Sequence, residues 1–125
     1  MPESQNTEWK SKWKDEYLEW ICGYANAQGG KYIGCDDSGN VVGLPNAKKL
    51  LEDIPNKIRD SMGIIVGVNL LEQNSKEYIE IDVPAYPIGI SCKGVYYYRS
   101  GSTRQILTGP ALEAFSYAQT GGNLG

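Results

Sequence analysis

The sequence contains no histidine. This absence excludes Ser-His and Cys-His nucleophiles, and it excludes zinc catalysis that depends on histidine ligands. Cysteine is also scarce: Cys22, Cys35 and Cys92 are the only three, and their wide spacing predicts neither a disulfide framework nor a zinc site. We expect them to be buried free thiols. Any chemistry must therefore depend on carboxylates, lysines, hydroxyl groups or a bound metal.

Long apolar runs and a basic surplus are lacking as well. No stretch reaches the roughly 18 apolar residues that a transmembrane helix needs, and the polar N-terminus does not have the apolar segment of a signal peptide. These observations predict a cytoplasmic protein with no membrane partner. The formal net charge is −3, which argues against a strong general attraction to nucleic acids but leaves room for a local basic face.

The length of 125 residues suits one domain. We place it at residues 1–118 and interpret residues 119–125, which are rich in glycine, as a flexible tail or linker to further C-terminal domains of a longer chain. Apolar periodicity predicts three helices, over residues 9–27, over residues 46–62 with a kink or break at Pro55, and from Thr108 onward. Strands are expected over residues 31–35, 41–44, 64–71, 77–83 and 95–99. Because hairpins dominate and no βαβ repeat is present, the pattern predicts an α+β fold with a largely antiparallel sheet.

Carboxylates form the first candidate site. Glu3 and Glu8 precede the first helix, and Asp36 and Asp37 follow the first strand. If the N-terminal segment runs beside the end of that strand, the carboxylates converge, and a set of oxygen ligands suits Mg²⁺ or Mn²⁺. The alternative interpretation is a simple turn at residues 36–39, where Asp and Gly are favoured for local backbone reasons.

Basic, aromatic and hydroxyl side chains form the second candidate site. Exposed tyrosines beside arginines can stack on bases and bind phosphates, and lysines at the start of the first helix would add positive charge. The candidate nucleic-acid-binding residues are Lys10, Lys12, Tyr97, Arg99, Ser100, Ser102, Thr103 and Arg104. The alternative is an ordinary strand with a polar turn, and lysines that are merely solvated.

Four ordered blocks, together covering residues 3 to about 115, resemble the Schlafen-type AlbA-like domain. They are Glu3-Ser4-x-x-x-Glu8-Trp9-Lys10, Ala25-Asn26-Ala27-Gln28-Gly29-Gly30, Ile33-Gly34-Cys35-Asp36-Asp37-Ser38-Gly39 with Val42-Gly43-Leu44, and Tyr97-Tyr98-Arg99-Ser100-Gly101-Ser102-Thr103. The resemblance implies an α+β domain that binds DNA or RNA. In bacteria such a domain often stands at the N-terminus of longer transcriptional regulators, and a DNA-binding module of this kind is the leading hypothesis.

The resemblance also implies two alternatives. Relatives with ribonuclease activity use three carboxylates, which correspond here to Glu3, Glu8 and Asp37, and these would hold Mg²⁺ or Mn²⁺ with Lys10 near the scissile phosphate. Those nucleases join two copies of the unit in one chain, so this single copy would have to form a homodimer. The third hypothesis is a dimerisation module that serves the assembly of a longer protein.

Overall fold

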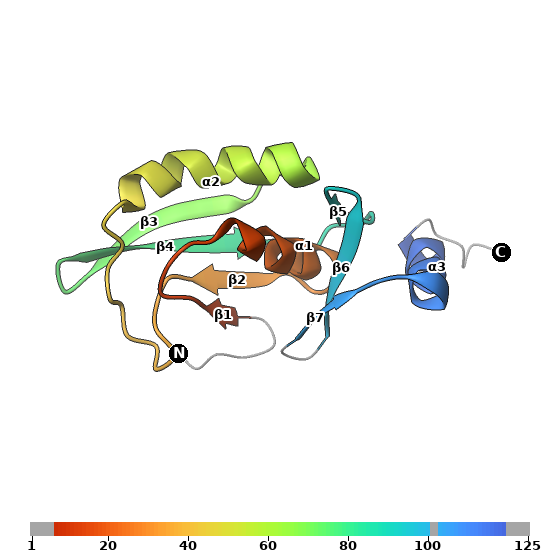
Figure 1. Ribbon diagram of the computed structural model, residues 1–125, viewed down its shortest axis with the longest axis horizontal. Helices are drawn as coiled ribbons and strands as arrows, with labels where there is room; N and C mark the ends of the chain where they lie inside the picture. The colour runs from red at the N-terminus through yellow and green to blue at the C-terminus, as the bar shows by residue number, and fades with distance from the viewer. Residues whose placement is uncertain (1–6, 101–102, 120–125) are drawn as a thin grey trace.

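Two sheets and three α-helices form the structure, a computed structural model that describes residues 7–100 and 103–119 (Figure 1). The four-stranded sheet has the order β1-β2-β4-β3, with bounds β1 Thr7–Trp9, β2 Gly30–Ile33, β3 Gly67–Gln73 and β4 Lys76–Val83. The three-stranded sheet has the order β5-β6-β7, with bounds β5 Ser91–Cys92, β6 Val95–Ser100 and β7 Thr103–Ile106. The α-helices are α1 Leu18–Asn26, which follows the short 3₁₀ helix η1 Asp15–Tyr17, α2 Ala47–Met62 and α3 Gly109–Gln119. The α+β class is confirmed: within the described residues every strand pair except β1–β2 is antiparallel.

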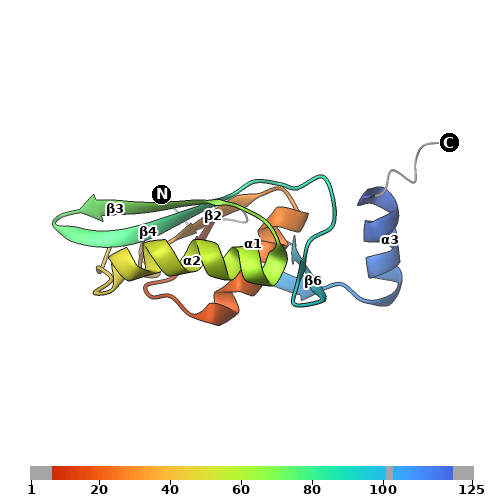
Figure 2. The ribbon, with the colours of Figure 1, turned by 90° about the horizontal axis from the view of Figure 1, so that it is seen from above.

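The β3–β4 hairpin and α2 follow the sequence pattern closely. Alternation along β4 places Ile79, Ile81 and Val83 in the core, and α2 covers that face of the sheet (Figures 1 and 2). The sequence predicts a kink or a split of α2 at Pro55; the split does not occur, because the helix is continuous from Ala47 to Met62. Pro55 lies on the exposed side, where water can satisfy the carbonyl that loses its partner, while the buried apolar side of the helix keeps it on the sheet.

Two expectations about the first half of the chain are corrected. The predicted helix over residues 9–27 begins only at Leu18, because β1 pairs with β2, residues 10–14 are irregular, and residues 15–17 form the short 3₁₀ helix η1. Backbone pairing extends beyond β1, since the Lys10 amide donates to the carbonyl of Ile33 at 3.1 Å. The predicted strand over residues 41–44 is absent, and this segment leads directly into α2.

The short strands β1, β5 and β7 were not predicted. Each has two to four residues, too few for a hydrophobic period to show in the sequence.

Helix α1 joins the two sheets. Its side chains Ile21, Tyr24 and Ala25 have no exposed surface, and it packs against both β2 and β6. The chain leaves α1 through Gly29, whose φ of +78° is a left-handed conformation that terminates helices. A Cβ at Gly29 would lie 2.7 Å from the carbonyl oxygen of Val83, so this position requires glycine.

Helix α3 stands apart from the two sheets at the C-terminal end of the molecule (Figures 1 and 2). Its Phe115 ring packs against Tyr96 and Tyr98, with centroid distances of 6.3 and 6.0 Å. In the part of the chain that the structure describes, no helix has both the length and the apolar character required to cross a membrane.

Candidate nucleic-acid interface

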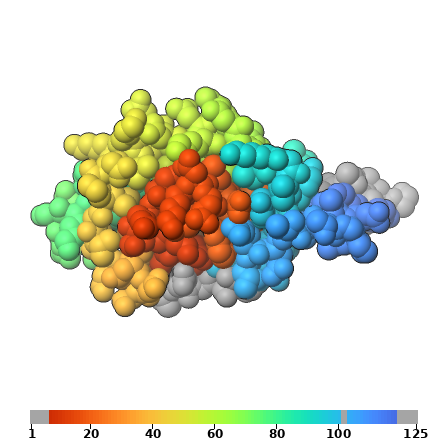
Figure 3. All heavy atoms as spheres, viewed as in Figure 1, coloured from red at the N-terminus to blue at the C-terminus, as the bar shows by residue number. Residues whose placement is uncertain are grey.

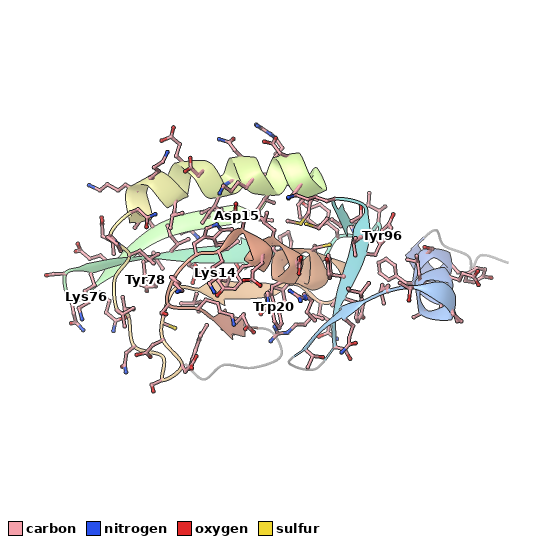
Figure 4. All side chains as sticks on the ribbon, viewed as in Figure 1. Lys14, Asp15, Trp20, Lys76, Tyr78 and Tyr96 are labelled. Atoms are coloured by element: carbon pink, nitrogen blue, oxygen red, sulfur yellow. The ribbon has the colours of Figure 1, made fainter. Side chains whose placement is uncertain are left out.

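Trp20, on α1, is the centre of the candidate interface. Its half-buried ring lies within 5.8 Å of Lys10 Nζ, 4.8 Å of Arg99 Cζ and 5.6 Å of Arg104 Cζ. The three cations come from the end of β1, from β6 and from β7, so the fold assembles them from distant parts of the sequence. Figure 4 shows Trp20 beside α1 on the face turned to the viewer. Cations over an indole ring are held by its quadrupole, so the cluster is stabilised before any ligand arrives.

A buried ion pair lies beneath this cluster. Arg99 Nη1 donates to Glu8 Oε1 at 2.8 Å, and the two side chains are only 3% and 9% exposed. The Arg99 guanidinium also stacks against Trp20 and Tyr24, at 4.8 and 4.9 Å from the ring centres. The pair therefore connects β1 of one sheet to β6 of the other. It also fixes the position of the Arg99 guanidinium against which the Trp20 ring packs.

Two further cations lie at the solvent boundary. Lys10 Nζ is 3.3 Å from Glu8 Oε2, and Arg104 forms an ion pair with Glu19 of α1. The Lys10 and Arg104 side chains are each 31% exposed, so both remain accessible from outside. They are the predicted binding residues that the structure places best for contact with a ligand.

The β6 residues of the predicted interface lie deeper than expected. Tyr97 was expected to be exposed, but it is only 7% exposed, because α1 covers the face of β6 that carries Tyr97 and Arg99. Burial raises the pKa of Tyr97, with a further contribution from the Glu19 carboxylate, so its hydroxyl stays neutral at ordinary pH. The binding roles of Tyr97 and Arg99 stay predictions. Their buried positions are suited to supporting the side chains of the cluster around Trp20.

Of the remaining predicted binding residues, those that the structure describes are exposed. The Thr103 hydroxyl at the start of β7 donates to the carbonyl of Ser100 at the end of β6, at 2.8 Å. Lys12 is exposed and lines a groove beside α2. Ser102 lies outside the described residues.

The structure places β1 beside β2, as the carboxylate hypothesis requires. Strand β1 runs parallel to β2, with Glu8 opposite Tyr32. Asp36 takes the structural role expected for a turn, since its Oδ1 accepts hydrogen bonds from the amides of Ser38 and Asn40, both at 2.9 Å. Asp37 is exposed in the same turn.

A complete three-carboxylate site is not visible in the described part of the chain. Glu3 lies outside it, and within it no three acidic or thiol side chains come close enough to hold a metal. Both oxygens of Glu8 face cations, Arg99 and Lys10, which leaves this carboxylate poorly suited to a metal in the present arrangement. The proposed metal and catalytic roles therefore stay predictions.

Two residues of the cluster, Trp20 and Glu19, were not singled out from the sequence. Trp20 has the spacing of a core-facing helical residue, which hides its second role. The one sequence signal for this cluster is the excess of lysine just before the aromatic helix α1. That signal does not predict that the arginines of β6 and β7 lie next to the same helix.

Comparison with known proteins places this geometry in context. Residues 3–108 match the family model described as Schlafen, AlbA_2. Among curated proteins, none matches the sequence. The crystal structure of the DIP2311 protein from Corynebacterium diphtheriae is similar with a TM-score of 0.68 and 16% identity, covering 92% of this chain and 24% of that one. The solution structure of the N-terminal domain of a RecG-related protein from Nitrosomonas europaea has a TM-score of 0.58 and 21% identity, covering 87% of this chain and 83% of that domain.

At these identities the two structures show a common fold. The chain spans about a quarter of the length of the Corynebacterium protein.

Proposed function

Because this chain belongs to the Schlafen, AlbA_2 family, we propose that it is a nucleic-acid-binding domain, with DNA as the ligand and with a longer regulatory protein as its setting. The observation that carries the proposal is the cluster around Trp20, where Lys10 and Arg104 flank a half-buried indole. Two comparisons support it. The similar domain from Nitrosomonas europaea is an N-terminal domain named for its relation to the DNA helicase RecG, and the Corynebacterium protein is about four times as long as the region it shares with this chain.

The cluster can exchange its internal partners for phosphates at low cost. Ion pairs at the solvent boundary contribute on the order of 0–1 kcal/mol each, so releasing Lys10 from Glu8 or Arg104 from Glu19 takes little free energy. Arginine then offers phosphate a bidentate contact, and the indole offers a base a stacking surface. The buried Glu8–Arg99 pair would remain in place and keep the surface preorganised.

Substitution of Arg104 by glutamine is expected to weaken DNA binding. Loss of one phosphate contact should lower the magnitude of the slope of log affinity against log salt by about 1, because one fewer counterion is released. The measurement is a fluorescence-anisotropy titration with labelled DNA over a series of salt concentrations.

Lys76→Gln is the matched control, since it removes the same charge at the tip of the β3–β4 hairpin, far from Trp20 (Figure 4). An equal loss for both variants would show that net charge alone drives binding, and absence of binding by the unaltered protein at low salt would remove the proposal.

A metal-dependent ribonuclease is the second candidate. The observation that favours it is the parallel pairing of β1 with β2, which brings the strand that carries Glu8 beside the strand that leads to Asp37. In this proposal Glu8 and Asp37 act with Glu3, and Lys10 would have to leave Glu8 when a cation binds. A homodimer would supply the composite cleft, and dimerisation remains a prediction.

Asp37→Asn tests this candidate. The substitution should abolish any Mn²⁺-dependent cleavage of structured RNA while leaving the melting temperature nearly unchanged, because Asp37 is exposed in a turn that Asp36 stabilises. Cleavage is followed on denaturing gels with the metal chelated as the blank. Cleavage that survives Asp37→Asn would exclude this carboxylate from the reaction.

A further inference from the structure

A row of aromatic rings continues from Trp20 along the segment that precedes α1. The Trp13 ring is 6.1 Å from Tyr17 and 5.7 Å from Tyr32, between ring centres. Lys10 Nζ lies 5.3 Å from the centre of Tyr17 and 5.8 Å from that of Trp20, so one cation links the two rings. We call the half-buried rings of Trp13, Tyr17 and Trp20 the aromatic row.

A basic groove lies at the Trp13 end of this row. It has a volume of about 460 Å³ and is formed by residues 11–13 on one side and, on the other, by residues 43–46 and by α2 as far as Lys57. Lys12, Lys49 and Lys57 line it together with one carboxylate, Asp53, and we call it the lysine groove. A volume of this size is within the range of about 300–1,000 Å³ that small-molecule sites have, so it can accept a sugar-phosphate unit.

The acidic neighbours of the lysine groove do not block it. Lys49 pairs with Asp53 at 3.3 Å, and Lys57 donates to Asp15 at 2.7 Å. The hydrogen bond from Lys57 lowers the pKa of Asp15, so this carboxylate remains charged and competes for the lysine. Both pairs are at the surface, where exchange of a carboxylate for a phosphate costs little.

The aromatic row and the lysine groove lie on one face of the molecule. In Figure 3 the early part of the chain, coloured red, covers the middle of that face, with the start of α2 (yellow) on one side and β6–β7 (cyan to blue) on the other. Figure 4 places Lys14, Asp15 and Trp20 on this same face. Cations therefore flank the aromatic rings at both ends, with Arg104 near Trp20 and the lysine groove near Trp13.

This arrangement of aromatic rings flanked by cations fits unpaired bases better than a duplex. In B-DNA the bases of each strand are stacked about 3.4 Å apart, and their faces are covered. The Trp13 and Tyr17 rings meet edge to face, with an angle of 87° between their planes, so each ring can offer its own face only to a base that is not stacked on its neighbour. Rings that stack on bases, combined with cations that follow the backbone, are the usual means by which proteins bind single strands without reading sequence.

We propose that this face binds a single-stranded nucleic acid, with bases stacked on the aromatic row and the flanking phosphates in the lysine groove. The inference rests on the proposed function and specifies that its DNA ligand is unpaired. It also assigns a binding role to Trp13, Tyr17 and Lys49, which lie outside the cluster around Trp20.

The first experiment compares labelled oligothymidine, oligouridine and a DNA duplex of the same length at low salt, by fluorescence anisotropy with the full chain. Single strands are expected to bind at least about tenfold more tightly than the duplex, which corresponds to roughly one stacked base. Tight binding of oligothymidine supports the inference, whereas tight binding of oligouridine alone would overturn it in favour of an RNA strand.

Two matched pairs of variants locate the binding face. Lys49→Gln should lower the magnitude of the salt slope for single strands by about 0.7, whereas Lys48→Gln, at the adjacent exposed position of α2 outside the groove, should leave it unchanged. Tyr17→Leu should weaken single-strand affinity about tenfold, whereas Tyr117→Leu, on α3, should have no effect. Thermal melting of each variant shows that the fold is kept, and Lys49→Gln carries the test if Tyr17→Leu does not fold.

The outcomes separate the two proposals. Duplex binding as tight as single-strand binding, or Lys49→Gln behaving like Lys48→Gln, would overturn the single-strand inference and leave the nucleic-acid function standing. Absence of binding to all three probes would overturn both.

Discussion

Substitution of Asn26 by alanine is expected to lower the free energy of unfolding by about 3 kcal/mol or more, one of the two largest effects expected in this protein. The Asn26 side chain is buried and makes three hydrogen bonds across the fold. Its Nδ2 donates to the carbonyls of Ile90 and Tyr97 at 2.7 and 2.8 Å, and its Oδ1 accepts from the Ile90 amide at 2.7 Å. Alanine would remove this partner from three backbone groups; the Ile90 carbonyl keeps the Cys22 thiol at 3.2 Å, and a buried group left unsatisfied costs about 1–3 kcal/mol.

Urea denaturation followed by circular dichroism measures this loss. Asn69→Ala is the matched control, because Asn69 is exposed and its amide makes only a long contact of 3.4 Å with Glu80; its effect should be within about 0.5 kcal/mol. Similar midpoints for the two variants would mean that the hydrogen bonds of Asn26 do not hold α1 to the second sheet.

The aspartate variant at the same position adds a pH dependence. Asp at position 26 would keep an acceptor for the Ile90 amide but would turn a carboxylate toward two carbonyl oxygens, so its folded-state pKa should rise above the unfolded value of about 3.9. A raised folded pKa means that the stability of Asn26→Asp is retained below the unfolded pKa and is lost as the pH rises toward the folded pKa. The unaltered protein should not show this loss, since an amide does not titrate.

Local elements are predictable from this sequence where the chain obeys one period. Alternation along β4 and the apolar stripe of α2 are local patterns, and the structure confirms both. Gly29 is predictable from another local requirement, because helices commonly end at a residue in the left-handed conformation, which glycine adopts easily. In the region before α1 the local pattern is misleading. Trp13 and Tyr17 recur at a helical spacing, but they lie before α1, and their rings pack on each other and on Tyr32.

The candidate site is less predictable because it depends on long-range contacts. The sequence identifies Lys10, Arg99 and Arg104 as cations of interest, but not that all three meet at Trp20. The separation of 91 residues between Glu8 and Arg99 leaves no local signal, and neither residue type predicts burial. A buried charged pair becomes visible only when the two sheets are placed together.

The second large effect is expected at this buried pair. Arg99→Met should destabilise the protein by about 3–5 kcal/mol, because it leaves the Glu8 carboxylate buried without the guanidinium that compensates it. Lys49→Ala breaks an exposed pair with Asp53 and serves as the control, with an expected effect of about 1 kcal/mol or less. Denaturant titration of both variants makes the comparison.

A double-mutant cycle separates the contribution of the pair from the cost of isolating one charge. Glu8→Leu combined with Arg99→Met removes both charges and should recover most of the stability lost by Arg99→Met alone, because an apolar pair of similar volume replaces a desolvated ion pair at little cost. Additive losses would mean that the two side chains do not interact in solution. Recovery of stability without recovery of nucleic-acid affinity would show that the pair is retained to position Trp20 and the cations around it, rather than to stabilise the fold.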